Sequence, residues 1–438
     1  MKLSTTARRA CFGLVTVWTL SAISVSAADA ELHSNWPRFR GPLGTGVTTE
    51  KDLPLKWSNE ENITWKLAIP GQGSSSPVVW NDRIFFTTGR ERNGTRGYDR
   101  YLICVDRKSG QVAWETLTAS GDPGETHPDN PHASSTPSVD GERVYSFFGK
   151  GGLQCHDFSG QLLWKRDDLG EFLSIWGTAA SPILEGDLCI VCCDQDAALV
   201  FDPDPSLPSR AYILAVNKLT GEDVWRTTRF GCRGFSTPVP FVRPDGKREL
   251  VVNSPDGVHA YDPVKGTLNW SVHRDTAFGE PHPAFGHGLI YAYSGRPGLV
   301  FAIKPGGSGN ITKTHVAWSV NRRNRDVCSP VVRGNELINF DRGGAGGAYD
   351  ALTGKELWKA RVAGSIYASP VVSGDGNIYF LTRNGVTHIL PPTPGGMNPI
   401  AENRLGTSEE DFSASPAVSN GQIFIRSGSV LYCIGKER

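Results

Sequence analysis

Short apolar runs alternate with turn residues along almost the whole chain. A small residue followed by proline opens such a run eight times, and three further short runs follow most openers. The openers are Ser76-Pro77, Thr136-Pro137, Ser181-Pro182, Thr237-Pro238, His282-Pro283, Ser329-Pro330, Ser369-Pro370 and Ser415-Pro416. Consecutive openers are 60, 45, 56, 45, 47, 40 and 46 residues apart. Runs of this length bounded by Gly, Asn and Asp are typical of β-strands, and four strands every ~45 residues are the period of a propeller blade.

The last run of each repeat carries tryptophan after a turn that ends in glycine. The fullest copies are AYDALTGKELW (Ala348 to Trp358), AVNKLTGEDVW (Ala215 to Trp225), AYDPVKGTLNW (Ala260 to Trp270) and CVDRKSGQVAW (Cys104 to Trp114). An Asp or Asn side chain can cap such a turn, and glycine can adopt its positive φ. The flat indole then offers a large surface for packing against the neighbouring repeat.

The two ends of the repeated region complement each other. The eighth repeat stops after its third run, at Leu431 to Cys433, while an unassigned tryptophan run, Ile63 to Ile69, precedes the first opener. We therefore expect this early strand to complete the last blade and remove a free sheet edge. The sequence predicts an all-β, eight-bladed β-propeller. The alternative, a parallel sheet with helical crossovers, lacks amphipathic helical stretches of useful length.

The first 27 residues have the pattern of an export signal. Basic residues precede an apolar stretch from Cys11 to Val25, and Val25-Ser26-Ala27 resembles a signal peptidase site. The alternative is an N-terminal anchor, but about 15 apolar residues fall short of the ~20 that a spanning helix needs. We expect cleavage after Ala27, a periplasmic or extracellular protein, and no transmembrane segment after cleavage. The domains expected are a signal peptide (1–27), an extension (28–60) and the propeller (61–438).

Composition narrows the class of partner. The chain has 45 Lys plus Arg and 45 Asp plus Glu, so no net field attracts nucleic acid. Its 50 glycines and 29 prolines suit many turns and few long helices. We expect a monomer with no nucleic-acid partner.

The cysteine positions argue against a disulfide framework, although eight cysteines follow the predicted leader. Cys104, Cys155 and Cys433 occupy the position before the turn that Ala215 and Ala260 fill in other repeats. They are therefore expected to be small buried spacers on separate blades, too far apart to bridge. Cys328 lies in a small-residue position just before an opener, with the same implication.

The tryptophan repeat resembles that of the PQQ-type β-propellers, the quinoprotein alcohol dehydrogenase-like superfamily. Its tryptophan-docking motif, AxDxxTGxxxW, is closely matched by Ala348 to Trp358, and the likeness extends over about residues 61 to 438. The run from Trp36 to Pro42 (WPRFRGP) is similar to the start of exported bacterial members known as PQQ-binding-like propeller repeat proteins. The resemblance implies the fold more strongly than an activity. The family includes PQQ-dependent dehydrogenases and the cofactor-free lipoprotein subunit of the outer-membrane β-barrel assembly machinery; this chain lacks the lipidated cysteine of the latter.

Loops that enter the innermost strands of a propeller converge near its axis, so residues just before each opener are expected to line a central funnel. The candidates are His132, Trp176, Arg233, Glu280, His282, Arg325, Asp326, Tyr367 and Asp411, with Gln72 in the corresponding place of the first repeat. Such a polar set can simply solvate a channel and join blades, which is the interpretation we favour. Alternatively, Trp176 and Tyr367 could stack on a flat ring while the arginines pair with its carboxylates.

The run CCDQD, Cys192 to Asp196, bears on the alternative function. PQQ alcohol dehydrogenases place a disulfide between adjacent cysteines over the quinone, and the resemblance makes Asp194 and Asp196 candidate oxygen ligands for Ca²⁺. The other interpretation, which we favour, puts Cys192 and Cys193 on opposite faces of one strand and the aspartates in its turn.

The sequence thus favours an exported, non-catalytic propeller that acts as a binding or assembly scaffold for an envelope or secreted protein, with no cofactor expected. The alternative is a PQQ- and Ca²⁺-dependent dehydrogenase of an alcohol or sugar. No spacing typical of a zinc protease or a serine hydrolase occurs.

Overall fold

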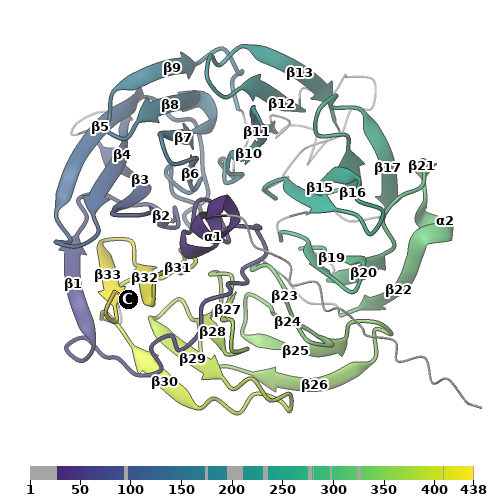
Figure 1. Ribbon diagram of the computed structural model, residues 1–438. Coiled ribbons are helices and arrows are strands. Elements are labelled where there is room, and N and C mark those ends of the chain that lie inside the picture. Colours follow the sequence, from purple (N-terminus) through teal and green to yellow (C-terminus); the bar gives the residue numbers. More distant parts are fainter. Residues whose placement is uncertain are drawn as a thin grey trace, which may run out of the picture.

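The strands form a closed ring of eight sheets. The structure is a computed structural model that describes residues 27–92, 97–172, 176–194, 211–229, 235–274, 279, 281–295, 298–322, 327–407 and 409–437. Within these residues each sheet is one blade, and the strand that follows each opener is nearest the centre (Figure 1). The predicted eight-bladed, all-β propeller is confirmed.

The first four blades follow one another along the chain. Blade 1 contains β2 (Val78–Trp80), β3 (Arg83–Glu91), β4 (Tyr98–Asp106) and β5 (Val112–Gly121). Blade 2 contains β6 (Ser138–Val139), β7 (Arg143–Phe147), the 3₁₀ turn η1 (Gly149–Gly151), β8 (Leu153–Asp157) and β9 (Leu162–Arg166). Blade 3 contains β10 (Ile183–Glu185), β11 (Leu188–Cys193), β12 (Tyr212–Asn217) and β13 (Asp223–Thr228). Blade 4 contains β14 (Val239–Val242), β15 (Arg248–Ser254), β16 (Gly257–Tyr261) and β17 (Leu268–His273), and β21 (Gly309–Asn310) pairs in parallel with its outer strand.

The remaining blades continue around the ring. Blade 5 contains β18 (Ala284–Gly286), β19 (Leu289–Tyr293), β20 (Leu299–Ile303), the short helix α2 (Thr312–His315) and β22 (Val316–Asn321). Blade 6 contains β23 (Val331–Arg333), β24 (Glu336–Phe340), β25 (Ala345–Asp350) and β26 (Glu356–Arg361). Blade 7 contains β27 (Val371–Val372), β28 (Ile378–Leu381), β29 (Val386–Leu390) and β30 (Ala401–Arg404). Blade 8 contains β31 (Ala417–Ser419), β32 (Gln422–Arg426), β33 (Val430–Ile434) and β1 (Ile63–Ala68).

Blade 8 closes the ring by combining both ends of the repeated region. Its outermost strand, β1, runs antiparallel to β33, with Leu67 opposite Leu431. The early strand predicted to complete the last blade does so. Because β33 then has a strand on each side, its backbone groups are paired within the sheet.

The repeated small residues and tryptophans lie directly opposite each other in the outer strand pairs. Cys104 faces Trp114, Ala215 faces Trp225, and the other five pairs are Cys155 with Trp164, Ala260 with Trp270, Ala302 with Trp318, Ala348 with Trp358 and Cys433 with Trp65. A small side chain at this position leaves room for the indole ring. The described cysteines are all buried free thiols, as expected for spacers.

Five of these tryptophans fasten their blade to the next. Each indole Nε1 donates a hydrogen bond to a turn carbonyl oxygen of the following blade, at 2.7 to 3.1 Å, and the ring lies against the turn glycine. The donor and acceptor pairs are Trp65 with Arg107, Trp114 with Phe158, Trp164 with Lys218, Trp225 with Pro263 and Trp318 with Ala351. The predicted packing between repeats is therefore confirmed at these positions.

Trp270 and Trp358 differ, because the blades that follow them lack the short turn ending in glycine between their third and fourth strands. Trp270 instead donates to both carboxylate oxygens of Glu249, at 3.0 Å each, within its own blade. Trp358 donates to Glu336 at 2.9 Å in the same way. Each glutamate also pairs with an arginine, Arg243 in the case of Glu249. A buried carboxylate thus replaces the neighbouring turn as the indole acceptor.

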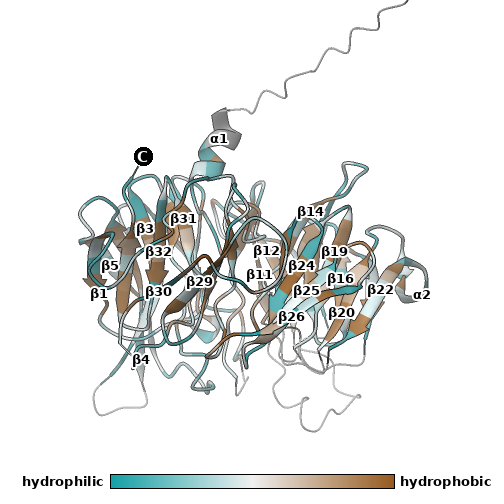
Figure 2. Ribbon diagram, turned by 90° about the horizontal axis from the view of Figure 1, so that it is seen from below, coloured by the Kyte–Doolittle hydropathy of each residue, from teal (hydrophilic) through white to brown (hydrophobic). Residues whose placement is uncertain are grey.

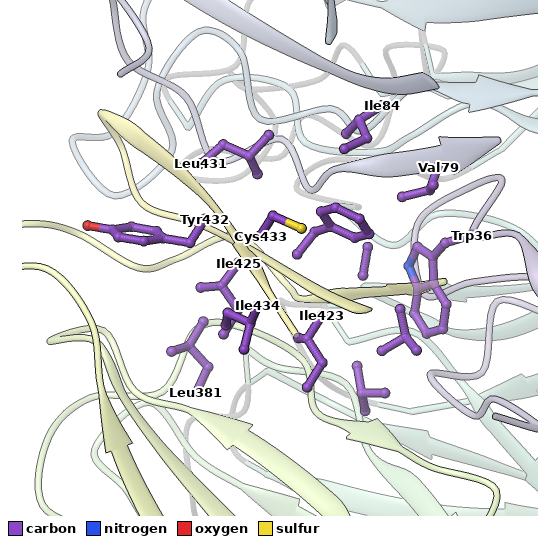
Figure 3. Close-up of a cluster of buried hydrophobic side chains, with 14 of the residues drawn as sticks. Trp36, Val79, Ile84, Leu381, Ile423, Ile425, Leu431, Tyr432, Cys433 and Ile434 are labelled. Carbon is purple, nitrogen blue, oxygen red and sulfur yellow. The ribbon is translucent and has the colours of Figure 1, made fainter. Parts of the chain in front are cut away.

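Apolar side chains fill the space between neighbouring blades. Figure 2 shows hydrophobic residues along the strands and hydrophilic ones toward many of the loops. Figure 3 shows the cluster at the closing seam, where Ile425 and Ile434 of blade 8 lie among residues of blades 1 and 7. Trp36, which is 1% exposed, joins this cluster from outside the repeats.

The segment between helix α1 (Ala27–Ser34) and β1 crosses one face of the ring, where α1 stands over the centre (Figures 1 and 2). Its backbone pairs with innermost strands: Trp36 with Val79 of blade 1, and Thr48 with Val372 of blade 7. These strands have one unpaired edge facing the axis, so the crossing segment supplies partners for their backbone groups. The predicted leader, apart from Ala27, lies outside the described residues. None of the described helices has the length and apolarity needed to span a membrane.

Candidate functional site: the central channel

A ring of hydrogen bonds joins the eight openers around the axis. In seven cases the backbone N–H of one opener donates to the side-chain hydroxyl of the next, at 2.8 to 3.0 Å. The last bond, from Ser415 N to Ser76 Oγ, joins blade 8 to blade 1. The repeated Ser or Thr is thus explained by an inter-blade contact. The only break among these openers lies between Thr237 and His282, because histidine carries no hydroxyl.

His282 instead contacts the crossing segment. Its Nδ1 lies 3.4 Å from the carbonyl oxygen of Gly44, and its ring meets Phe39 edge-on, with centroids 5.0 Å apart. Burial lowers the pKa of His282 well below its usual value, so the ring is neutral and Nδ1 carries the donated proton. Nε2 is then an acceptor, and it has no hydrogen-bond partner among the described residues.

Arg40 fixes the crossing segment inside the channel. The side chain is 2% exposed, and Nη2 donates to the carbonyl oxygen of Pro330 at 2.7 Å. Burial lowers the pKa of this arginine to about 9, which still leaves it charged at neutral pH. The neighbouring Phe39 faces the channel cavity. This end of the channel is therefore occupied by the chain itself.

A loop from the opposite face bridges the channel mouth. It connects β5 to β6, and its Asp129 carboxylate reaches blades 6 and 7 across the ring. Oδ2 accepts from Arg342 Nη2 at 2.8 Å and from Tyr367 Oη at 2.9 Å, while Oδ1 accepts from Arg383 Nη1 at 2.7 Å. Partial burial alone would raise the pKa of Asp129, but these donors and charges lower it overall. The carboxylate is therefore firmly ionised.

Between these two ends lies a cavity of about 240 Å³. Its wall includes opener hydroxyls, Phe39, His282, Asp129, Tyr367 and Trp176. The Trp176 ring stacks on His127, with centroids 4.7 Å apart and planes 21° apart. The space thus has an aromatic wall and a charged rim, an arrangement that can hold a flat ligand with a polar end.

The structure brings together only part of the predicted funnel set. Trp176, His282 and Tyr367 line the cavity. Asp411 lies at the rim, where it accepts two hydrogen bonds from Arg383 at 2.9 and 2.5 Å. His132 packs beside Tyr98 and borders a separate small hollow of about 20 Å³. The predicted residues Arg233, Glu280, Arg325 and Asp326 lie outside the described residues.

The described part of the predicted quinone and calcium site does not fit that role. Cys192 and Cys193 are consecutive residues of β11, and they belong to two different hydrophobic clusters, one on each side of blade 3. The Asp194 side chain is 10% exposed and pairs with Arg229 at 3.4 Å, and it is not part of the cavity wall. Asp196 lies outside the described residues. Among the described residues no three His, Cys, Asp or Glu side chains are grouped so that they could hold a metal ion.

Sequence reasoning missed the residues at the rim and the floor of the cavity. His127 and Asp129 lie in the longest interval between openers, 60 residues, and that excess length was the available signal for a long loop. Arg342 begins the run RGGAGG, whose first residues form the turn between β24 and β25. No local pattern links Asp129 to Arg342, because they are 213 positions apart.

Comparison with known proteins supports both the fold and the family. A family model described as outer membrane protein assembly factor BamB matches residues 47–193 and 209–437. No curated protein matches the sequence. BamB from Moraxella catarrhalis is similar in structure, with a TM-score of 0.59 and 16% identity over 86% of this chain and 98% of that one. Quinohemoprotein alcohol dehydrogenase from Comamonas testosteroni has a TM-score of 0.67 and 11% identity, covering 94% of this chain and 82% of that one. A europium-containing methanol dehydrogenase has a TM-score of 0.55 and 10% identity, covering 92% and 98%.

Proposed function

This chain belongs to the family described as outer membrane protein assembly factor BamB, and from that premise we propose that it is an exported, non-catalytic scaffold that binds a protein partner in the cell envelope. The proposal places the mature protein in the periplasm or outside the cell. The single observation that carries it is the state of Asp129, the carboxylate at the cavity rim. Two arginines and a tyrosine hold this group as a fixed anion.

A dehydrogenase would need a different carboxylate at this place. A general base works best when its pKa lies near the working pH, so that it can accept the substrate proton. The guanidinium groups of Arg342 and Arg383 lower the pKa of Asp129 instead, which makes it a weak base. The arginines serve to hold the loop, and the arrangement favours binding over proton transfer.

The blade contacts suit a scaffold. Ring closure by β1, the indole bonds between blades and the hydrogen bonds between openers all join neighbouring blades in one rigid body. A rigid body presents its loops at fixed separations, which lowers the entropy cost of binding a partner. The same rigidity is also compatible with a catalytic propeller, so activity has to be tested directly.

The test combines quinone binding with turnover. Purified mature protein is titrated with PQQ, with and without Ca²⁺, by calorimetry and by quenching of tryptophan fluorescence. Alcohol and sugar oxidation is then measured with an artificial electron acceptor. We expect no oxidation that depends on both PQQ and Ca²⁺. Saturable, one-to-one PQQ binding that Ca²⁺ strengthens, together with turnover, would overturn the proposal in favour of the dehydrogenase alternative.

The partner is sought separately. Photo-crosslinking residues placed on the loops of the exported protein identify candidates in intact cells. A candidate supports the proposal only when it is purified and binds the purified propeller with a defined stoichiometry. If no purified candidate binds, the scaffold proposal fails.

A further inference from the structure

The rim of the cavity contains a carboxylate clamp made by two adjacent blades. Arg342 lies in the turn between β24 and β25 of blade 6, and Arg383 lies in the turn between β28 and β29 of blade 7. Their guanidinium carbons lie 5.2 and 4.7 Å from the centroid of the Tyr367 ring. The two cations and the phenol hydroxyl converge on one carboxylate, at present that of Asp129. Hydrogen bonds to a charged group, as here, are stronger than hydrogen bonds between neutral groups.

The clamp has supports other than the carboxylate it holds. Asp411 accepts from both Nε and Nη2 of Arg383, and the Tyr367 ring supports both guanidinium groups. Burial and the contact with Asp129 raise the pKa of Tyr367 to about 12, so its hydroxyl remains a donor at neutral pH. These supports come from the two loops that flank blade 7, while Asp129 comes from the loop between blades 1 and 2. Removal of Asp129 would therefore leave the clamp in place.

The loop that carries Asp129 begins at a glycine and meets the rest of the ring near its tip. Gly121, at the end of β5, has a φ of +109°, and an added Cβ there would meet open space. Near its tip, Asn130 Nδ2 and Thr126 Oγ1 donate to the carbonyl oxygen of Trp176 at 2.6 and 3.4 Å, and the His127 ring stacks on the Trp176 ring. Glycine at such a position tolerates large changes in backbone angle.

The cavity below the clamp offers the other half of a binding site. His282 is 3% exposed, lines the cavity, and has an Nε2 acceptor with no partner among the described residues. Such a buried acceptor without a partner is costly and calls for a hydrogen-bond donor. Phe39 and the stacked pair of Trp176 and His127 provide aromatic surfaces in the same space.

We propose that this cavity binds an aromatic carboxylate, with the ligand carboxylate displacing Asp129 from Arg342, Arg383 and Tyr367 and the aromatic group entering the space beside Trp176. Asp129 acts as an internal competitor that occupies the clamp in the free protein. The proposal deepens the proposed binding function by naming the chemistry that the site recognises. Two sources carry this chemistry: the C-terminus of a polypeptide that ends in an aromatic residue, or a small free acid.

The experiment uses matched probes on the full mature chain. The peptide Gly-Ser-Gly-Phe with a free C-terminus is compared with the same peptide amidated at its C-terminus, and with 3-phenylpropanoate, by calorimetry. We expect only the free carboxylates to bind. Tighter binding of the free peptide assigns the site to a chain terminus, and tighter binding of 3-phenylpropanoate assigns it to a small acid. Equal affinity for the free and amidated peptides would overturn the proposal.

Substitutions in the clamp and at Asp129, its competitor, should change the affinity for a carboxylate in opposite directions. Asp129→Asn removes the competing charge and is expected to tighten carboxylate binding about tenfold, whereas Arg342→Gln is expected to weaken it by about tenfold or more. Arg404→Gln is the control, because Arg404 is exposed on the outer strand of blade 7 and its guanidinium donates to the Asn384 carbonyl oxygen, away from the clamp carboxylate. Unfolding midpoints establish that each variant is folded, and Asp129→Ser replaces Asp129→Asn if the latter is not. An unchanged affinity in the folded Asp129 variant would overturn the proposal.

The outcomes separate this inference from the function on which it rests. Oxidation that requires PQQ and Ca²⁺ would overturn the scaffold function whether or not the carboxylate probes bind. Failure of the probes to discriminate carboxylate from amide would overturn only the assignment of the clamp.

Discussion

Trp65, in the closing strand β1, lies directly opposite Cys433 of β33. From there its indole donates to the carbonyl oxygen of Arg107 at 2.7 Å and covers Gly110 in blade 1. One side chain thus joins β1, blade 8 and blade 1. The seam of the ring depends on this contact.

Trp65→Ala is therefore expected to lower the free energy of unfolding by about 3 kcal/mol, since a half-buried indole and its hydrogen bond are both lost. Trp65→Phe keeps most of the packing and should cost only about 1 kcal/mol. Urea unfolding measures both values. Lys66→Ala, at an exposed position of the same strand, is the control and should change little. Equal effects of Trp65→Ala and Lys66→Ala would contradict the role of the seam.

The two tryptophans that donate to glutamate should respond differently from those that donate to a turn carbonyl. Trp270→Phe leaves the buried Glu249 carboxylate without its indole donor, which we expect to cost about 2 kcal/mol. Trp318→Phe loses a bond to the Ala351 carbonyl oxygen and should cost about 1 kcal/mol. Urea unfolding of the two variants compares the loss of a donor to a buried carboxylate with the loss of a donor to a carbonyl oxygen. A smaller loss for Trp270→Phe would show that Glu249 finds another donor.

Gly41 allows the crossing segment to fold back on Trp36. Its φ is +78°, and an added Cβ would lie 2.8 Å from the Trp36 ring. Gly246 has a similar φ of +82°, but an added Cβ there would meet nothing within 4 Å. Gly246→Ala should thus cost about 1 kcal/mol for backbone strain alone, and Gly41→Ala several kcal/mol because of the additional clash with a packed side chain. Thermal unfolding of the two variants measures both losses of stability. Similar losses would mean that the Trp36 ring can move away from the added methyl group.

Buried neutral histidines should make the fold sensitive to mild acid. Burial lowers the pKa of His156 to about 4, and that of His282 falls well below its usual value. Because the unfolded chain takes up these protons first as the pH falls, stability decreases below about pH 6.5 and is unaffected by these groups above it. For His156 alone the loss between pH 7 and pH 5 is about 2 kcal/mol.

Urea unfolding of the wild type and His156→Gln at these two pH values tests this expectation. The variant should lose about 2 kcal/mol less than the wild type over the same interval. An identical pH dependence of the two proteins would show that His156 is protonated in the folded state.

The thiols of Cys192 and Cys104 should be inert in the folded protein. Both are buried, and burial raises the pKa of each to about 12, so almost no thiolate forms at neutral pH. A thiol reagent should label them only after unfolding. Peptide mapping without reduction should find Cys192 and Cys193 unlinked, because they point to opposite sides of β11. A disulfide between them would contradict the strand geometry and support the quinone site.

The fold was readable from sequence because its signals are local and repeated. The small residue, the turn glycine and the tryptophan of Ala348 to Trp358 lie within one hairpin, so their spacing specifies the register of β25 and β26. Closure by β1 could be predicted because the eighth repeat lacked a fourth strand and one early strand was unassigned. Trp270 shows the limit of this reasoning: its own motif is nearly complete, but its acceptor depends on the turn of the next blade, which has a different sequence.

The channel was harder to predict because its contacts join distant parts of the chain. Trp176 and Tyr367 lie just before an opener and His282 is part of one, and these three of the predicted residues line the cavity. Asp129 and Arg383 were not found, since each lies in a turn or loop of individual length and their pairing spans 254 positions. Phe39 reaches the cavity from a segment outside the repeat, so periodicity carried no information about it.

The pairing of β1 with β33 also sets an order of events during biosynthesis. The strand around Leu67 emerges from the ribosome before all eight openers, but its partner around Leu431 is made only after seven further blades. The seven intervening blades can form as they appear, whereas the seam has to wait for the last strand and then close a loop of several hundred residues. Until β33 is made, β1 has no strand to pair with, and the apolar side chains on both sides of the seam stay exposed to water. The nascent chain therefore needs protection from edge-to-edge association from the time β1 is made until β33 is made.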